Sequence, residues 1–200
     1  MNLFSAAGRR SSVPLFPLQV VLFPGALLPL RIFETRYMDM AKECLKTGNP
    51  FGVCLIREGR EVGEPAVPAI VGCTARIAQW DLPMPNLFHL LARGERRFRI
   101  VRTAVAPLGL LTCEAELLPA EPSGEAPDAL CRKVLAALVE RFGADRFPDP
   151  LALDDAAWVG FRLAEALPLR MEVRQQLLES ESPSARLAVL REILGEAGMT

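Results

Sequence analysis

Hydrophobic residues concentrate near the start of the chain, in the stretch VPLFPLQVVLFPGALLPLRIFETRY at residues 13–37. This stretch is apolar enough for a membrane segment, but prolines stand at positions 14, 17, 24 and 29. A proline inside a helix removes a backbone hydrogen bond and adds a ring clash, which excludes a spanning helix. Proline cannot donate to a sheet ladder, which excludes a fully paired central strand. The pattern therefore predicts two kinked, extended pieces that break at Phe23-Pro24-Gly25 and lead into a helix near Glu34-Thr35.

A single apolar stripe at helical spacing comes after this opening. Its members are Tyr37, Met40, Ala41, Cys44 and Leu45. Such a stripe is typical of an amphipathic helix that buries one face. Gly48 offers a left-handed stop, and Asn49-Pro50 prevents the helix from continuing.

Short apolar runs bounded by turn residues fill the next part of the chain. We expect strands over residues 51–56, 70–80, 87–93, 96–103 and 110–118. Gly72 predicts a bend or bulge, and Gly94-Glu95 predicts a tight connection between two strands. The last run alternates cleanly, with Leu111, Cys113, Ala115 and Leu117 on one face. Many short strands with one inserted helix favour a closed or nearly closed barrel, because closure removes exposed edges.

The remainder of the chain has helical patterns. PAEPSGEAP at residues 119–127 is a linker by composition. After it, Leu130, Val134, Leu138 and Phe142 recur at i+4 and predict one helix face. Asp154 or Asp155 can cap a second helix, and Ser182-Pro183 is typical of a helix start. We expect four helices in a small bundle over residues 128–200, a barrel over residues 13–118, and a flexible leader at residues 1–12.

Composition and charge narrow the function classes. The 200 residues carry a net charge of −1, so no overall field attracts nucleic acid or acidic membranes. The five cysteines, at positions 44, 54, 73, 113 and 131, lack ligand-pair spacing and predict small buried hydrophobes. An unpaired cysteine set fits a reducing compartment. Arg9-Arg10 before an apolar run resembles a secretory signal, but the prolines break that run, and we expect a cytoplasmic protein.

Catalytic chemistry has few candidates. His89 is the only histidine, and it lies in an apolar strand without a cue that pairs it with a nucleophile. No phosphate-binding loop of the G-x-x-x-x-G-K-[ST] type occurs. We therefore expect no enzyme activity, no cofactor and no metal site.

A basic cluster offers the best case for nucleic acid. Its members are Arg93, Arg96, Arg97, Arg99 and Arg102. Glu114 and Glu116 recur at the same two-residue spacing on the next strand, where cross-strand pairing would neutralise that face. The face of Arg97 and Arg99 also has no aromatic residue for base stacking, because Phe98 alternates to the opposite face. Nucleic acid is kept as an alternative ligand.

Several motifs in the same order resemble the Lon N-terminal domain, the substrate-binding module of ATP-dependent Lon proteases. The residues that match that family's opening are Pro14–Leu18, Val21–Gly25, Leu28–Leu30, Ile32–Glu34 and Arg36-Tyr37. Downstream matches are Phe51–Val53, Val71–Ala75, Gly94–Ile100, Leu167-Pro168, Gln176–Glu179, Ser182 and Arg186-Leu187. The resemblance implies an α+β fold, with an N-terminal PUA-like β pseudo-barrel that holds one inserted helix and a C-terminal helical bundle.

The resemblance also implies a function. A complete Lon protease adds ATPase and proteolytic modules, whereas this chain ends at Thr200. We therefore expect a free-standing, non-catalytic module that binds unfolded or tagged protein segments and acts with a separate ATPase or protease. A hydrophobic groove or an unpaired strand edge would serve that purpose. The candidate contact residues are Phe23, Leu27, Glu34, Arg36 and Tyr37. RNA or small-molecule binding by the barrel is the alternative, and the sequence does not give the oligomeric state.

Overall fold

The computed structural model describes residues 11–199, and the chain divides into two compact units, Met1–Pro119 and Ala120–Thr200. A flexible leader was expected at residues 1–12. Residues 1–10 lie outside the described part of the chain, and Ser11 and Ser12 belong to the first strand. No helix among residues 11–199 combines the length and the apolar character that crossing a bilayer requires.

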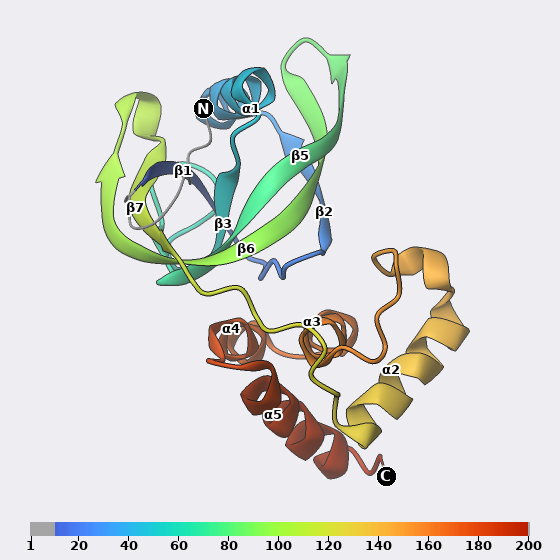
Figure 1. Cartoon of the computed structure of the whole chain (residues 1–200). Helices are drawn as coiled ribbons and strands as arrows, with labels where there is room; N and C mark the ends of the chain where they lie inside the picture. Colours follow the sequence, from blue (N-terminus) through green and yellow to red (C-terminus); the bar gives the residue numbers. More distant parts are fainter. Residues whose placement is uncertain (1–10, 200) are drawn as a thin grey trace. The chain divides into compact units, whose positions relative to one another are not determined.

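The first unit is a small barrel with one inserted helix (Figure 1). Its strands are β1 (Ser11–Leu18), β2 (Leu27–Ile32), β3 (Phe51–Glu58), β4 (Val67–Pro68), β5 (Val71–Met84), β6 (Leu87–Val105) and β7 (Leu111–Leu117). The sheet runs β1-β7-β6-β5-β3-β4, and a parallel pairing of β1 with β3 joins its two sides. Five strands therefore form a closed ring, as the sequence pattern predicted.

The barrel core comes from alternating positions of these strands. Leu111, Cys113 and Ala115 of β7 are buried, which confirms the predicted inward face. They pack in one cluster with residues of β1, β3 and β6, among them Leu15 and Phe98. Strand β1, which contains Pro14 and Pro17, changes partner along its length, from β7 at Ser11–Pro14 to β3 at Leu15–Leu18.

Strand β6 corrects one expectation. Gly94-Glu95 was expected to connect two strands, but both residues lie inside β6, a single strand of 19 residues. Gly94 is needed for a close approach instead, since a Cβ at this position would lie 2.3 Å from the carbonyl oxygen of Phe23. The backbone of Gly94 also exchanges hydrogen bonds with the opening turn, accepting from Gly25 at 2.8 Å and donating to Ala26 at 2.9 Å.

Gly72 has a similar role to Gly94. It was expected to mark a bulge, but the irregularities of β5 fall at Cys73–Ala75 and further along the strand. A Cβ on Gly72 would lie 2.5 Å from both the Sγ of Cys54 and the carbonyl oxygen of Val53. The residue therefore permits close packing of β5 on β3.

Helix α1 (Thr35–Thr47) agrees with the prediction at both ends. Glu34 stands at its N-cap, and Gly48 ends it in the left-handed conformation with φ of 70°. Tyr37, Met40, Ala41 and Cys44 of the predicted stripe are buried. The polar side of the helix remains exposed, as an amphipathic surface helix requires.

Strand β2 lies outside the closed ring. It pairs antiparallel with the first half of β6, from Leu27 opposite Arg93 to Ile32 opposite Phe88. None of the other strands in residues 11–199 pairs with its second edge. The first unit therefore has an open edge at β2, next to the point where the chain enters α1 (Figure 1).

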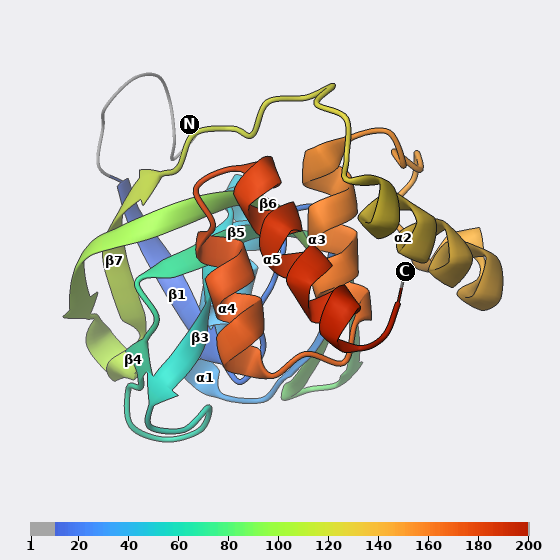
Figure 2. The ribbon, with the colours of Figure 1, turned by 90° about the horizontal axis from the view of Figure 1, so that it is seen from below.

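The second unit contains four helices, α2 (Ala129–Phe142), α3 (Ala156–Ala166), α4 (Met171–Glu179) and α5 (Pro183–Glu196). The predicted caps are confirmed, because Asp155 accepts from the N–H of Trp158 and Ser182 accepts from that of Ala185. Helix α5 lies against both α3 and α4 (Figure 2). Buried leucines of α5, Leu187, Leu190 and Leu194, form its inner face.

The buried face of α2 differs from the prediction. The expected row was Leu130, Val134, Leu138 and Phe142, whereas the buried residues are Cys131, Leu135 and Val139. Two neighbouring i+4 rows of this helix are apolar, so the spacing alone cannot choose between them. The Sγ of Cys131 lies 3.7 Å from the carbonyl oxygen of Leu187, which places the second row against α5.

A buried arginine organises the second unit. The guanidinium of Arg186 donates to both carboxylate oxygens of Glu121, at 2.7 and 2.5 Å, and its Nε donates to the carbonyl oxygen of Leu177. The same group lies 3.8 Å from the ring centroid of Phe161. Arg186 therefore joins α5 to α3 and α4, and it also binds Glu121 in the expected linker.

The contact of Gly94 with the opening turn predicts a large cost for one methyl group. Gly94→Ala should destabilise the chain by about 2 kcal/mol, because backbone atoms must shift to make room. Urea denaturation measures this change. Gly195→Ala is the matched control, since nothing lies within 4 Å of a Cβ there. A Gly94→Ala protein as stable as the parent would contradict the close packing.

The Arg186–Glu121 pair predicts a different result. Arg186→Met should cost about 3–5 kcal/mol, because it leaves the largely buried carboxylate of Glu121 without its cation. The double variant Arg186→Met with Glu121→Leu should recover much of this loss. Arg191→Met is the control, because the Arg191 side chain is 60% exposed and its 3.8 Å pair with Asp128 should contribute about 1 kcal/mol or less. Equal losses for Arg186→Met and Arg191→Met in urea would contradict the assignment.

Candidate functional site

A groove runs along β2 on the surface of the first unit, and we call it the β2 groove. Its volume is about 350 Å³, within the range of about 300–1,000 Å³ found for ligand sites. One wall is β2 and its extension, residues 28–34. The residues of the other wall and the floor are Phe16, Leu18, Val20, Tyr37, Glu61 and Val62.

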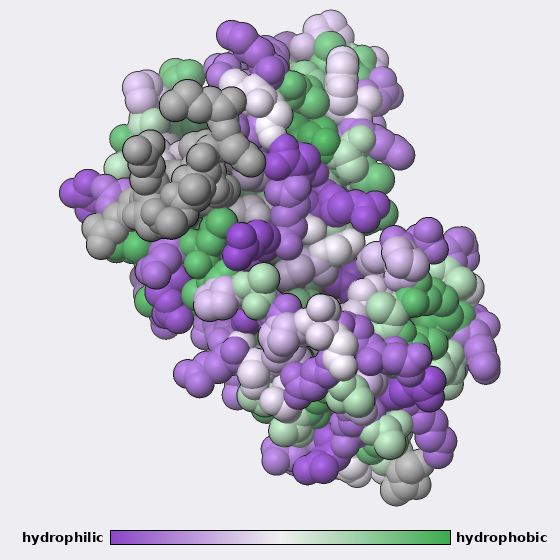
Figure 3. Space-filling view, viewed as in Figure 1, coloured by the Kyte–Doolittle hydropathy of each residue, from purple (hydrophilic) through white to green (hydrophobic). Residues whose placement is uncertain are grey.

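Hydrophobic side chains gather around this groove. Figure 3 shows another face of the first unit, where hydrophobic residues also gather between α1 and the β5–β6 hairpin. Two residues that line the groove are strongly exposed for their type, Phe33 at 58% and Val62 at 55%. Exposed apolar residues beside a concave surface are typical of an interaction site.

The floor of the groove is rigid. The rings of Tyr37 and Phe16 stack with centroids 4.1 Å apart and an angle of 23° between their planes. Tyr37 starts the buried stripe of α1, and Phe16 belongs to β1. A helix and a barrel strand therefore fix the position of the two rings, as a preformed site requires.

Behind the floor, a buried arginine holds the entry to α1. The Nη2 of Arg36 donates to the Glu34 carboxylate at 2.8 Å, and its Nη1 donates to the carbonyl oxygen of Gly109 at 3.1 Å. The guanidinium lies 4.7 Å from the ring centroid of Tyr37. Arg36 therefore fixes Glu34 and Tyr37, which line the groove, without lining it.

Burial raises the pKa of the Tyr37 hydroxyl above its ordinary value of 10.0. The positive charge of Arg36 opposes this shift, whereas the carboxylates of Glu34 and Glu61 add to it. The floor of the groove thus experiences the negative charge of two carboxylates.

The rim of the groove contains two further charged groups. Glu61 accepts a hydrogen bond from the backbone N–H of Gln19 at 2.6 Å. Arg31 projects from β2 and is exposed. Within residues 11–199, neither side chain takes part in an ion pair. Both charges are therefore available to a ligand.

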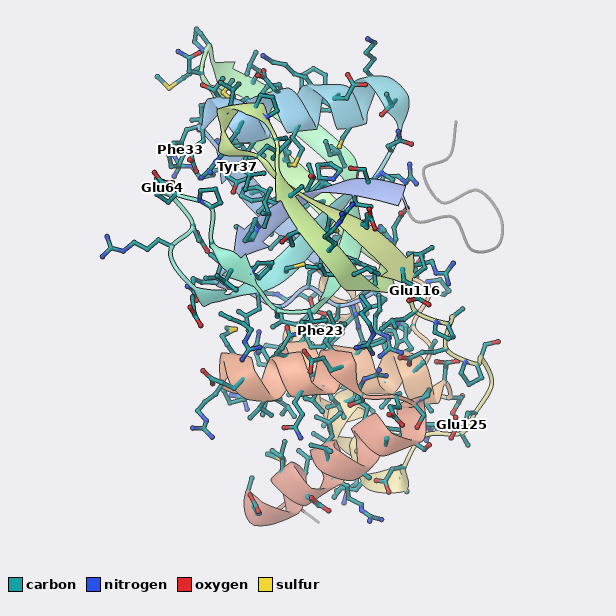
Figure 4. The ribbon with its side chains drawn as sticks, turned by 90° about the vertical axis from the view of Figure 1, so that its left-hand side faces the viewer. Phe23, Phe33, Tyr37, Glu64, Glu116 and Glu125 are labelled. Atoms are coloured by element: carbon teal, nitrogen blue, oxygen red, sulfur yellow. The ribbon has the colours of Figure 1, made fainter. Side chains whose placement is uncertain are left out.

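The structure separates the five predicted contact residues. Glu34 and Tyr37 line the groove, and Arg36 lies behind it. Leu27 is 45% exposed at the start of β2, whereas Phe23 is 1% exposed. In Figure 4, Phe33 and Tyr37 lie at one corner of the first unit, and Phe23 lies away from that corner. Phe23 lies in the opening turn, and its ring is buried and therefore not accessible to a partner.

Several residues that line the β2 groove were not predicted from the sequence. They are Phe33, Glu61 and Val62, together with the apolar residues of β2. The sequence predicts only a loop at Glu61 and Val62, and these residues come close to β2 only in the folded barrel. Only Phe33 could have been noticed in the sequence, as a phenylalanine immediately before a helix start. It was interpreted as part of the family motif Ile32–Glu34 and not as a contact residue.

A second cavity of about 310 Å³ lies between α1 and the turn at η1 (Pro107–Gly109). Arg36 and Met40 contribute to its lining from the helix side. Leu108 contributes from the turn, where it is 71% exposed. None of the predicted contact residues except Arg36 reaches this cavity.

The five arginines of the nucleic-acid alternative do not share one face. Arg97 is buried, whereas Arg99 is exposed opposite Glu116. A register shift between Ile100 and Arg102 brings Arg102 to Glu114, with 2.7 Å between their charged atoms. Arg96 donates to the carbonyl oxygen of Leu118, and Arg93 lies on the β2 side of β6. The expected type of Arg–Glu pairing between β6 and β7 is thus present at Arg102 and Glu114.

Groups that could support catalysis do not converge. His89 lies opposite Arg31 and Asp81 in the sheet, and its Nε2 is buried without a hydrogen-bond partner among the described residues. All five cysteines are free and buried, and burial raises the pKa of Cys113 to about 12. Residues 11–199 contain no group of three or more His, Cys, Asp or Glu side chains arranged to hold a metal.

Comparison with known proteins gives a consistent result. The family model of the ATP-dependent protease La (LON) substrate-binding domain matches residues 12–196. A solved Lon N-terminal domain protein from Xanthomonas campestris is 39% identical, with a TM-score of 0.77 over 91% of this chain and 98% of that one. The N-terminal domain of Mycobacterium avium complex Lon protease, at 23% identity and a TM-score of 0.65 over 91% of this chain and 97% of that one, shares the fold.

Whole Lon proteases are also similar to this chain. "Lon protease 2" of Herpetosiphon aurantiacus is 29% identical over 96% of this chain and 24% of its own length. "Lon protease" of Paraburkholderia phytofirmans is 25% identical over 84% of this chain and 22% of its own length. The chain therefore spans about a quarter of these relatives.

Tyr37 gives a direct measure of the groove floor, because it is the only tyrosine of the chain. Absorbance titration of tyrosinate should give a pKa above 10.0 in the folded protein and about 10 in urea. Since folding raises this pKa, the associated stability is complete below pH about 10 and is lost as the pH rises through the folded pKa. Glu61→Gln should lower the folded pKa, because it removes one of the carboxylates that raise it. Identical titrations of folded and unfolded protein would contradict this description of the floor.

Proposed function

The chain belongs to the family of ATP-dependent protease La (LON) substrate-binding domains, and from this membership we propose that it binds unfolded or tagged segments of other proteins in the β2 groove. One observation supports the β2 groove as the binding site. The groove combines exposed apolar side chains, two charges available to a ligand and an open strand edge on the same corner of the unit. Extended segments bind such surfaces through main-chain hydrogen bonds and apolar pockets.

The lining of the groove supports binding rather than catalysis. Its ionisable residues are Arg31, Glu34, Tyr37 and Glu61. A nucleophile activated by a neighbouring base would need a serine, cysteine, threonine or lysine within hydrogen-bond reach of that base. Such a pair is not found among the groove's lining residues. We infer a non-catalytic recognition role for this domain.

The similar Lon proteases suggest what happens to a protein segment after it binds. The similar proteins named above are Lon proteases, of which this chain matches about a quarter. The bound segment would pass to an ATPase and a protease that lie elsewhere. Free, buried cysteines fit a reducing compartment such as the cytoplasm.

The alternative, RNA or small-molecule binding by the barrel, has weaker support. Arg99 and Arg102 of the arginine cluster lie opposite glutamates of β7, and the Arg102–Glu114 pair is formed. Phosphate binding would need to displace that pair, at a cost that a free basic surface does not have. Salt-dependent binding of RNA in a mobility assay would favour this alternative.

The proposal predicts that apolar residues of the groove rim are required for binding. Phe33→Ser should weaken binding of reduced, carboxymethylated α-lactalbumin about tenfold or more, because exposed aromatic residues dominate such interfaces. Fluorescence anisotropy measures the affinity, and urea denaturation should show little change, since Phe33 is 58% exposed. Val105→Ser is the matched control, because Val105 is 60% exposed and does not line the groove. Equal affinities of the two variants would place the binding surface elsewhere.

A further inference from the structure

The backbone of β2 has a definite hydrogen-bonding direction. Gly94 donates to the carbonyl oxygen of Ala26, so the carbonyl group of Ala26 points toward β6. In an antiparallel pair such positions alternate, which makes Leu28, Leu30 and Ile32 the next residues bonded to β6. The N–H and C=O groups of Leu27 and Arg31, and the C=O of Pro29, therefore point away from β6.

Pro29 fits this assignment independently. Proline has no N–H, so it is tolerated in a strand only where that group would face away from the ladder. The position of Pro29 in the register, opposite Leu91, has this property. The outer edge of β2 thus presents two donors and three acceptors. No described residue takes up these groups through a backbone hydrogen bond outside the sheet.

The groove runs along the same edge. It is lined by every residue from Leu28 to Phe33, although alternate residues of a strand point to opposite faces. A cavity that touches consecutive residues must run along the edge of the strand rather than over one face. Leu18 and Val62 line the groove from segments outside β2.

We propose that an extended protein segment binds as an added strand on the outer edge of β2, with alternate side chains directed to the groove floor at Tyr37 and Phe16. This inference rests on the function proposed above and specifies how the segment is held. Main-chain hydrogen bonds to Leu27, Pro29 and Arg31 would give affinity without strict sequence preference. Apolar side chains on the floor would select unfolded segments.

A segment of another protein fits this edge better than a second copy of the chain. Two copies of β2 would bring together two prolines, so that the pair would lack two donors, whereas a peptide without proline lacks one. Two copies would also bring two Arg31 charges to the same edge. Proline and charge on an edge strand are the usual means of preventing self-pairing.

The charges favour a basic residue in the bound segment. The carboxylates of Glu34 and Glu61 both act on the groove floor, and Glu61 has no ion pair among the described residues. A lysine or arginine of the segment that reaches Glu61 would meet a complementary charge. An extended segment with alternating apolar residues and one basic residue is therefore the expected ligand.

A pair of variants isolates the main-chain contact. Arg31→Pro removes the outward N–H, and Arg31→Ala removes the side chain but keeps the N–H. For the best-binding synthetic segment of α-lactalbumin, Arg31→Pro should bind about tenfold more weakly than Arg31→Ala, because one acceptor of the peptide loses its donor. Circular dichroism checks that both variants fold. Equal affinities of the two folded variants would overturn the added-strand mode.

A scan of the same peptide keeps the proposal testable if Arg31→Pro does not fold. Each backbone N–H is replaced in turn by an N-methyl group, and losses of about tenfold should occur at alternate positions within the bound stretch. A parent peptide that binds but shows no such alternation would overturn the added-strand mode and leave the proposed function intact. If neither the peptides nor carboxymethylated α-lactalbumin bind, the proposed function fails, and this inference fails with it. A Lys→Glu change in the peptide should weaken binding to the parent protein more than to Glu61→Gln.

Discussion

The close approach of the Phe23–Ala26 turn to Gly94 determines where β2 lies. A side chain at Gly94 would collide with the carbonyl oxygen of Phe23, and the same glycine exchanges two backbone hydrogen bonds with Gly25 and Ala26. This contact sets the register of β2 on β6. The register in turn decides that Pro29 faces outward and that Leu27 and Arg31 present free donors. The groove and its open edge are therefore consequences of one glycine in the middle of a long strand.

Both units also use a buried arginine in the same way. Arg36 binds the Glu34 carboxylate and the carbonyl oxygen of Gly109, and its guanidinium lies near the ring of Tyr37. Arg186 binds the Glu121 carboxylate and the carbonyl oxygen of Leu177, and lies over the ring of Phe161. A planar guanidinium can satisfy several acceptors and pack on an aromatic face at once. Each arginine thereby joins its helix to a neighbouring segment through hydrogen bonds and an aromatic contact.

Sequence patterns predicted most elements but not the long-range contacts. Periodicity and capping located α1, the helix starts at Asp155 and Ser182, and the inward face of β7, because these depend on neighbouring residues. Gly72 was interpreted as a bend or bulge and Gly94 as part of a tight connection, since a single sequence does not show which backbone will pass close to a glycine. Glu34 and Tyr37, two of the predicted contact residues, line the β2 groove, whereas Phe23 was chosen for its hydrophobicity and is buried. Glu61 and Val62 could not be predicted, because only the folded barrel brings their loop to β2.

Amide hydrogen exchange of β2 tests the central claim most directly. In the free protein the amides of Leu28, Leu30 and Ile32 should exchange slowly, and those of Leu27 and Arg31 should exchange rapidly, because only the first set is bonded to β6. Addition of a saturating unfolded peptide should slow exchange at Leu27 and Arg31 about tenfold or more, since a strand added at the outer edge protects these two donors. Unchanged exchange at both amides in the saturated complex would contradict binding at the β2 edge.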